Sequence, residues 1–361
     1  MTFKATKNEW SELYVFLKLL AEGRLYLGNH RGEINKRAFW PISTIEREDY
    51  DGTRRYFISE EWVSVTGKGD YIKLHRAALA AMSDKVLDLI KSSSDEEISC
   101  PEDIKGFLDT AQIVQLEPQT MDRTDLKIGF WSPHKIPTGF MVQSRLAPMR
   151  PLLDGGRAAN LKMELTGKRF AQPEIENINA IESAESVRDR IFRLEELGGA
   201  LKYADIANRV FRCNLNMIDL HFGRILAEMI RNMHLQGKTR VCELVNLTKL
   251  QNPIKIKEDL IQKHRYYEYK MKQFLMAVAS GMRPAKIFDG TDSDVEGMLI
   301  LNSDGSIIGY HKEERKIYED FLYLNTRLLK GPLDKDKYGF LEREHGTYYM
   351  KLNTKVGLIK R

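Results

Sequence analysis

Residues 125–131 read DLKIGFW and residues 139–146 read GFMVQSRL, two short runs that are rich in β-forming residues. The turn-rich segment SPHKIPT, which contains two prolines, separates them. A third run, NLKMEL at 160–165, follows a Gly-Gly pair. This order of strands and turns predicts a three-stranded meander in the middle of the chain.

The second of these runs has two distinct faces, because side chains on a strand alternate. Met141, Gln143 and Arg145 share one face, which is predicted to be the polar one. The other face is predicted to point into the core and carries Phe140, Val142, Ser144 and Leu146.

The rest of the chain mixes helical and strand patterns. Apolar residues recur at steps of three and four in several segments, and these predict helices at 8–22 (ending at Gly23), 73–92, 101–110, 174–234 and 256–280. Alternating patterns around Gly or Asp-Gly predict a small sheet or hairpin at 37–66, a hairpin at 297–311 and a closing β run at 348–359. The fold class is therefore predicted to be mixed α/β (α+β).

The length of 361 residues predicts two or three domains. The changes of pattern suggest residues 1–170 as an N-terminal region with the central strands, 171–295 as a helical region, and 296–361 as a strand-rich C-terminal region. The last of these could pack on the first core as one unit.

Composition excludes several classes of protein. The hydrophobic and charged fractions, 42% and 30%, are those of a folded protein. The three widely spaced cysteines form no CxxC pair, so neither a disulfide framework nor a structural zinc site is expected. No apolar run is long enough to span a membrane or to form a signal peptide, and a cytoplasmic location is expected.

Basic residues gather around the predicted meander. Eight lie between positions 125 and 169: Lys127, Lys135, Arg145, Arg150, Arg157, Lys162, Lys168 and Arg169. Only three acids oppose them there, namely Asp125, Asp154 and Glu164. A basic block around an isolated acid is typical of a phosphate-binding site, although a solvated loop region explains the charge equally well.

Asp125 matches the first part of a minimal metal-nuclease pattern on neighbouring strands. That pattern needs an acid on one strand and, on the next, an acidic or amide residue two positions before a lysine. Asp125 begins the first strand as required, and Gln143 lies on the second. Taken alone the pattern is weak, because an Asp at the start of a strand is usually a turn or cap residue.

The chain also resembles the HpaII-type restriction endonucleases along nearly its whole length. Six segments carry the resemblance in the same order and spacing as in that family: NEWSELYVFLKLLAEGRLY; DLKIGF with TGFMVQSRL; RPLLDGGRAANLKMEL; NLNMIDLHFGRILAEMI; YKMKQFLMAVASGM with FDGTDSDVEGMLILNSDGSIIGYH; and EDFLYLNTRL with KLNTKVGL. The resemblance implies a PD-(D/E)xK restriction-endonuclease-like core with helical and C-terminal β-containing additions. It implies a type II enzyme of a restriction-modification system that uses Mg²⁺ to hydrolyse double-stranded DNA at a short palindrome.

The resemblance also assigns site residues. It makes Asp125 the first metal-binding acid, and Glu12 or Glu9 of the N-terminal helix could supply another. On the second strand the family pattern resembles Gly-Phe-Ser-x-Lys-Ser, whereas this chain has Met141 and Gln143 at the serine and lysine positions. Either the site has lost its cation and cuts poorly, or the functional pair has shifted by two residues to Gln143 and Arg145, which keeps the face of the strand. An arginine can neutralise a phosphate but cannot act as a base.

Double-stranded DNA is the expected partner. Side chains that could reach it are Arg150, Arg157, Asn160, Asn325 and Arg327. Cutting both strands of a palindrome implies either a homodimer or two sequential nicks, and the expected functional partner is a cognate DNA methyltransferase. Two alternatives stay open: a sequence-specific DNA-binding protein with a degenerate, non-cleaving site, and a repair or RNA-processing nuclease of related fold.

Overall fold

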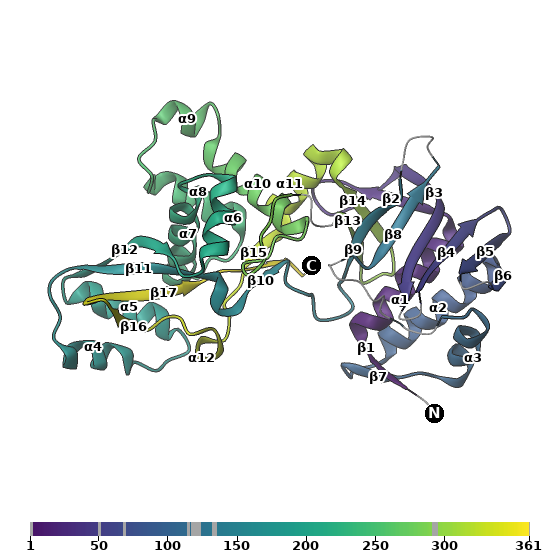
Figure 1. The fold of residues 1–361 in the computed structure, drawn as a ribbon, viewed down its shortest axis with the longest axis horizontal. Helices are drawn as coiled ribbons and strands as arrows, with labels where there is room; N and C mark the ends of the chain where they lie inside the picture. Colours follow the sequence, from purple (N-terminus) through teal and green to yellow (C-terminus); the bar gives the residue numbers. More distant parts are fainter. Residues whose placement is uncertain are drawn as a thin grey trace.

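The computed structural model describes residues 3–49, 52–67, 70–113, 116, 124–131, 136–290 and 295–360. Figure 1 shows an elongated molecule with two lobes. Each lobe surrounds its own hydrophobic core. No helix of the described residues is long and apolar enough to cross a membrane. The connector predicted at 132–138 lies largely outside these residues.

A mixed nine-stranded sheet builds the first lobe. Its order is β2-β14-β13-β9-β8-β3-β4-β5-β6. The strands are β2 (Arg24–Gly28), β3 (Ile34–Asp49), β4 (Gly52–Ile58), β5 (Trp62–Gly67), β6 (Asp70–His75), β8 (Leu126–Phe130), β9 (Thr138–Ser144), β13 (Val295–Leu301) and β14 (Ile307–His311). The neighbours β3, β8 and β9 are antiparallel, whereas β9 and β13 run parallel, so the chain between them must cross over.

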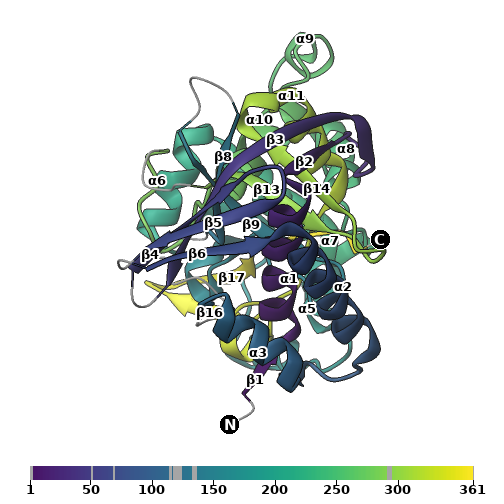
Figure 2. The same ribbon diagram turned by 90° about the vertical axis from the view of Figure 1, so that its right-hand side faces the viewer.

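Three helices lie in the same lobe: α1 (Lys7–Glu22), α2 (Arg76–Ser92) and α3 (Glu102–Thr110). Figure 2 shows α1 and α2 side by side. Helix α1 begins with a capping box of Thr6 and Glu9 and ends at Gly23, whose φ of 61° suits a residue without a side chain. The predicted first helix and its stop are therefore confirmed. Two short strands, β1 (Lys4–Thr6) and β7 (Glu97–Ser99), pair beside these helices.

The second lobe combines a four-stranded sheet, β12-β11-β17-β16, with most of the helices. Its strands are β11 (Asn160–Gly167), β12 (Gly199–Ile206), β16 (Leu341–Glu344) and β17 (Thr347–Asn353). The helices are α4 (Gln172–Asn179), α5 (Ser186–Glu196), α6 (Arg209–Ile218), α7 (Phe222–Gln236), α8 (Val241–Gln251), α9 (Glu258–Gln262), α10 (Tyr266–Ala279), α11 (Arg315–Asn325) and α12 (Leu333–Asp336), with 3₁₀ turns η1 (Gly156–Ala159) and η2 (Lys312–Glu314). A small sheet of β10 (Leu153–Asp154), β18 (Lys355–Leu358) and β15 (Thr326–Leu328) completes the fold.

The predicted meander is only partly correct. β8 and β9 pair as expected, with Leu126 opposite Phe140. The third predicted strand, at 160–165, belongs to β11 and pairs with β12 and β17 in the other lobe. The reason is the long connection after β9, which carries the chain out of the first sheet before the next strand begins.

The helical predictions need five corrections. Residues 73–75, predicted as the start of a helix, end the strand β6, and α2 begins only at Arg76. Residues 180–185 separate α4 from α5 within the run predicted at 174–234. β12 interrupts the run at 174–234, and Asp219, whose backbone is extended, separates α6 from α7. Arg265 has a φ of 49° and separates α9 from α10 within the run predicted at 256–280. The 297–311 hairpin is confirmed, since β13 and β14 pair across a turn closed by Gly305 and Asn302.

The segment 296–361 is divided between the lobes. Its first part, β13 and β14, extends the nine-stranded sheet, whereas β16, β17 and β18 lie in the two smaller sheets. The domain boundaries at 170 and 295 stay predictions.

Candidate functional site

Asp125 lies at the head of β8, against the neighbouring strand β9. Its N–H donates to the carbonyl of Phe140 at 2.9 Å, and its Oδ2 accepts from the N–H of Val142 at 2.6 Å. The carboxylate is therefore fixed against the middle of β9, as the meander predicted. Its side chain keeps 13% of its surface exposed, so a small ligand can reach it.

Glu12 reaches the same place from α1. The helix is tied to β9 by a hydrogen bond of 2.8 Å between the hydroxyl groups of Ser11 and Ser144. This contact fixes the position of α1 along β9. In this position the Glu12 side chain is only 5% exposed. Glu9, the other acid considered from sequence, accepts instead from the N–H of Thr6 in the capping box. Of these two helix acids, Glu12 is the one that the structure brings to Asp125.

Arg150 joins the two carboxylates. Its Nη2 lies 2.6 Å from Glu12 Oε1, and its Nη1 lies 3.9 Å from Asp125 Oδ1. The loop that carries Arg150 follows β9 and is held to α1 by the Asn8 side chain, which donates to the carbonyl of Pro148 at 3.2 Å. From sequence Arg150 is a DNA-contact candidate, but the structure places its guanidinium inside the acidic site. It remains 41% exposed there.

Gln143 is buried rather than solvated, because both faces of β9 are covered. Met141 belongs to the core of the second lobe, whereas Phe140 and Val142 belong to that of the first. The Gln143 amide donates to the Met141 sulfur at 3.6 Å. Its Oε1 has no hydrogen-bond partner among the described residues. The predicted polar face of this strand is therefore wrong.

In the described part of the chain, Gln143 forms no hydrogen bond with Glu12 or Asp125. Arg145 lies in the bend beyond β9, where its N–H donates to the carbonyl of Leu301 at 2.9 Å. Nor do the described residues contain a group of three or more His, Cys, Asp or Glu side chains placed to hold a metal ion. The described residues thus place two carboxylates and one guanidinium together at the candidate site.

A second group of buried charges lies behind Glu12. Arg54 Nη1 donates to Asp49 Oδ2 at 2.5 Å, and Arg47 Nε lies 3.7 Å from Oδ1 of the same carboxylate. Burial lowers the pKa of Arg47, while Asp49, Tyr56 and Glu12 oppose this shift. Sequence analysis missed this group, although the alternation of Ile45, Arg47 and Asp49 along β3 could have indicated it.

The sequence model of one protein family matches residues 6–358, nearly the whole chain; this family is described as the HpaII restriction endonuclease family. The chain belongs to this family. A relative, the type II restriction enzyme HpaII of Haemophilus parainfluenzae, is 27% identical over 363 residues, which cover 98% of each chain. No solved structure shows a significant match. The resemblance found in the sequence is confirmed.

Two DNA-contact candidates of this HpaII family member are buried. Asn160 donates to the carbonyls of Asp336 and Lys337 at 2.8 and 3.2 Å. Asn325 donates to the carbonyls of His30 and Phe321 at 3.0 and 2.8 Å. Their amides hold the polypeptide together and are not presented to a ligand. The sequence around an asparagine does not show whether its amide binds DNA or backbone carbonyls, so no local signal could have separated these roles.

The two arginine candidates are more accessible. Arg157 is exposed in η1, where its Nε donates to the carbonyl of Lys335 at 3.1 Å. Arg327 lies half-buried in β15. Neither position settles whether the side chain contacts DNA, and both stay predictions.

Replacing Asn160 should mainly affect folding. We expect Asn160→Ala to lower the free energy of unfolding by about 2–4 kcal/mol, because two buried carbonyls and the Asn353 amide lose their partner. Urea unfolding without DNA measures this, with the exposed Arg157→Ala as control. An unchanged stability together with lost DNA binding would contradict the structural role.

Proposed function

We propose that this HpaII family member is a type II site-specific deoxyribonuclease that hydrolyses phosphodiester bonds of double-stranded DNA at a short palindrome, with Mg²⁺ as cofactor. The observation that carries the proposal is the convergence of Glu12 and Asp125 on one guanidinium, from a helix and a strand head. A PD-(D/E)xK-type core is supported by the mixed sheet, in which an acid at the head of β8 lies against the antiparallel neighbour β9.

The residues present fit a magnesium ion. Mg²⁺ prefers oxygen ligands, and in phosphate-processing sites it is commonly held by one or two carboxylates together with water and substrate oxygens. Glu12 and Asp125 supply two such carboxylates within reach of one cation, Arg150. When bound, Mg²⁺ neutralises charge on the phosphate and lowers the pKa of water. Asp125 would be held in place for this task by the Val142 N–H.

Arg150 would supply the positive charge that β9 lacks at Gln143. A guanidinium presents several N–H donors in a planar fork that matches two phosphate oxygens. Because Arg150 stays partly exposed and follows β9 on a loop, it can turn from the two carboxylates toward a DNA phosphate. It would orient and neutralise the phosphate but could not take a proton from water. Arg150 would thus provide, from the loop after β9, the positive charge that the lysine of the family pattern provides on the strand.

The partners follow from this activity. Double-stranded DNA is the proposed substrate, a homodimer would cut both strands of a palindrome, and a cognate methyltransferase would protect the host sites.

Digestion of phage DNA tests the function. We expect discrete fragments with Mg²⁺ and intact DNA with EDTA, and sequencing of the fragment ends should return one palindrome. Intact DNA in both conditions would contradict cutting, and a continuous smear would contradict site specificity.

A further inference from the structure

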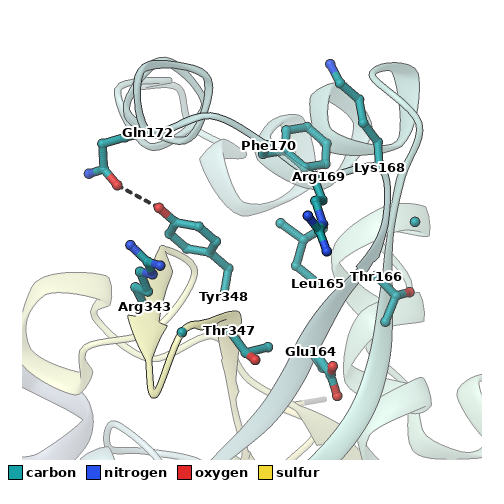
Figure 3. A pocket seen from close by; sticks show the side chains of 12 residues that line it. Glu164, Leu165, Thr166, Lys168, Arg169, Phe170, Gln172, Arg343, Thr347 and Tyr348 are labelled. Carbon is teal, nitrogen blue, oxygen red and sulfur yellow. Dashed lines mark hydrogen bonds between the residues drawn. The ribbon is translucent and has the colours of Figure 1, made fainter.

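A pocket opens at the far end of the second lobe, where β11 ends and β16 turns into β17 (Figure 3). Its volume is about 560 Å³, within the range of small-molecule sites. β11 is eight residues long, and its seven steps of about 3.3 Å each give roughly 23 Å between Asn160 and the pocket end of the strand. Glu12, Asp125 and Arg150 are not among the lining residues, so the pocket is separate from the proposed cutting site.

The pocket carries charges that the protein does not neutralise. Arg169 and Arg343 are exposed, and neither forms an ion pair with a described residue. Glu164, at the other end of the pocket in Figure 3, also lacks an ion pair in the described part of the chain. Lys168, by contrast, is paired with Glu174 at 2.7 Å. Among the described residues, two cations and one acid of the pocket thus have no ion-pair partner, although the Arg343 guanidinium lies 5.9 Å from the centre of the Tyr348 ring.

Two aromatic rings complete the lining. The Tyr348 hydroxyl donates to Gln172 Oε1 at 2.6 Å, which fixes the orientation of its ring. Phe170 lies on the opposite side, with Lys168 Nζ 5.3 Å from its ring centre. Figure 3 shows Arg343 and Tyr348 on one wall and Arg169 and Phe170 on the other. Proteins that bind single-stranded nucleic acid commonly combine positively charged side chains with aromatic rings on which the bases stack.

We propose that this pocket binds one unpaired nucleotide of a DNA strand. Arg169 and Arg343 contact its phosphate, because guanidinium groups are suited to phosphate oxygens. The base stacks on Tyr348, whose ring is held by Gln172, and Glu164 accepts a hydrogen bond from an amino group on the base edge, as acids do from cytosine. The choice of DNA as the occupant rests on the proposed function, but binding in the pocket needs no metal.

A strand, rather than a free nucleotide, is the better occupant. A duplex rises about 3.4 Å per base pair, so about seven base pairs of a DNA molecule lying on both lobes would span the length of β11. The pocket would then hold the substrate at a point away from the cut. In the sequence, Arg157 and Lys162 lie between Arg150 of the proposed cutting site and the first residues that line the pocket.

Fluorescence anisotropy in EDTA tests the proposal with three labelled probes: a 12-nucleotide single strand, a duplex with one unpaired nucleotide, and the fully paired duplex. Tyr348→Leu should weaken binding of the first two probes by about 5- to 150-fold, the range for loss of one stacked base. Arg169→Gln with Arg343→Gln should weaken it about tenfold and reduce the dependence of log K on log salt by about 0.7, the value for one phosphate of a single strand.

Arg209→Gln is the matched control. Arg209 is an exposed arginine of the same lobe that forms no ion pair with a described residue. Its replacement should leave binding unchanged. Equal losses with Arg209→Gln, or no loss with the pocket variants, would overturn the proposal. Equal losses for the fully paired duplex would overturn the unpaired-nucleotide assignment, and competition by free dCMP at micromolar concentration would overturn the assignment to a strand. Because no metal is present, these results do not depend on whether the chain cuts DNA.

Discussion

Asp125→Asn is expected to reduce Mg²⁺-dependent DNA cutting by about three orders of magnitude or more, since a bound metal ion contributes several kcal/mol to such reactions. The amide keeps the size of the carboxylate and an oxygen that can still accept from the Val142 N–H, so the strand pair β8–β9 should stay intact. What is lost is the charge that would hold the ion. Initial rates of supercoiled plasmid cleavage at several Mg²⁺ concentrations measure the effect.

The control for this variant is Asp84→Asn, which removes an exposed acid from α2. Its cutting rate should equal that of the unchanged protein. Thermal unfolding should show both variants folded, and both should still bind the recognition sequence in Ca²⁺ or EDTA. If Asp125→Asn cuts DNA as fast as Asp84→Asn, the metal site does not include this carboxylate and the proposed chemistry is wrong.

Arg150→Ala should lower the cutting rate by about 100- to 1,000-fold, the usual loss when one fixed group that stabilises transition-state charge is removed. Arg150→Lys should recover part of this loss, because it keeps the charge but not the planar pair of donors. The same alanine variant should bind Ca²⁺ more tightly without DNA, because the ion no longer competes with a guanidinium for Glu12 and Asp125. Calorimetry with Ca²⁺ measures this second effect independently of cutting.

The Arg145→Ala variant tests which of two arginines, Arg145 or Arg150, takes the place of the missing lysine. If Arg145 were the functional partner of Gln143, its removal would cost more activity than removal of Arg150. The contacts of Arg150 with both carboxylates predict the opposite order. Arg145→Ala should also leave Ca²⁺ affinity unchanged.

Much of the first lobe could be predicted from sequence. The apolar steps of three and four and the terminal Gly23 predicted α1, and the β-forming runs around Asp125 and Phe140 indicated the pair β8–β9. These features depend on residues close together in the chain. The place of Asp125 followed from them, because an acid at the head of one strand must lie beside the next.

The rest depended on long-range packing. Nothing local shows that β11 leaves the first sheet, since its alternation suits either sheet. Likewise, Gln143 looks solvated until helices and strands of the second lobe cover its face. Arg150 could not be assigned to the acids, because its loop is positioned by Asn8, 142 positions earlier in the chain.

The double burial of β9 gives a reason for the unusual residue at position 143. An ammonium group there would lose most of its hydration, which costs several kcal/mol unless partners compensate for it. A side chain on the following loop retains contact with solvent, and Arg150 does so. A cation on this loop therefore provides a positive charge beside Glu12 and Asp125 at a smaller dehydration penalty than a cation on the strand. Without a charged side chain at position 143, β9 can be buried between the two hydrophobic cores.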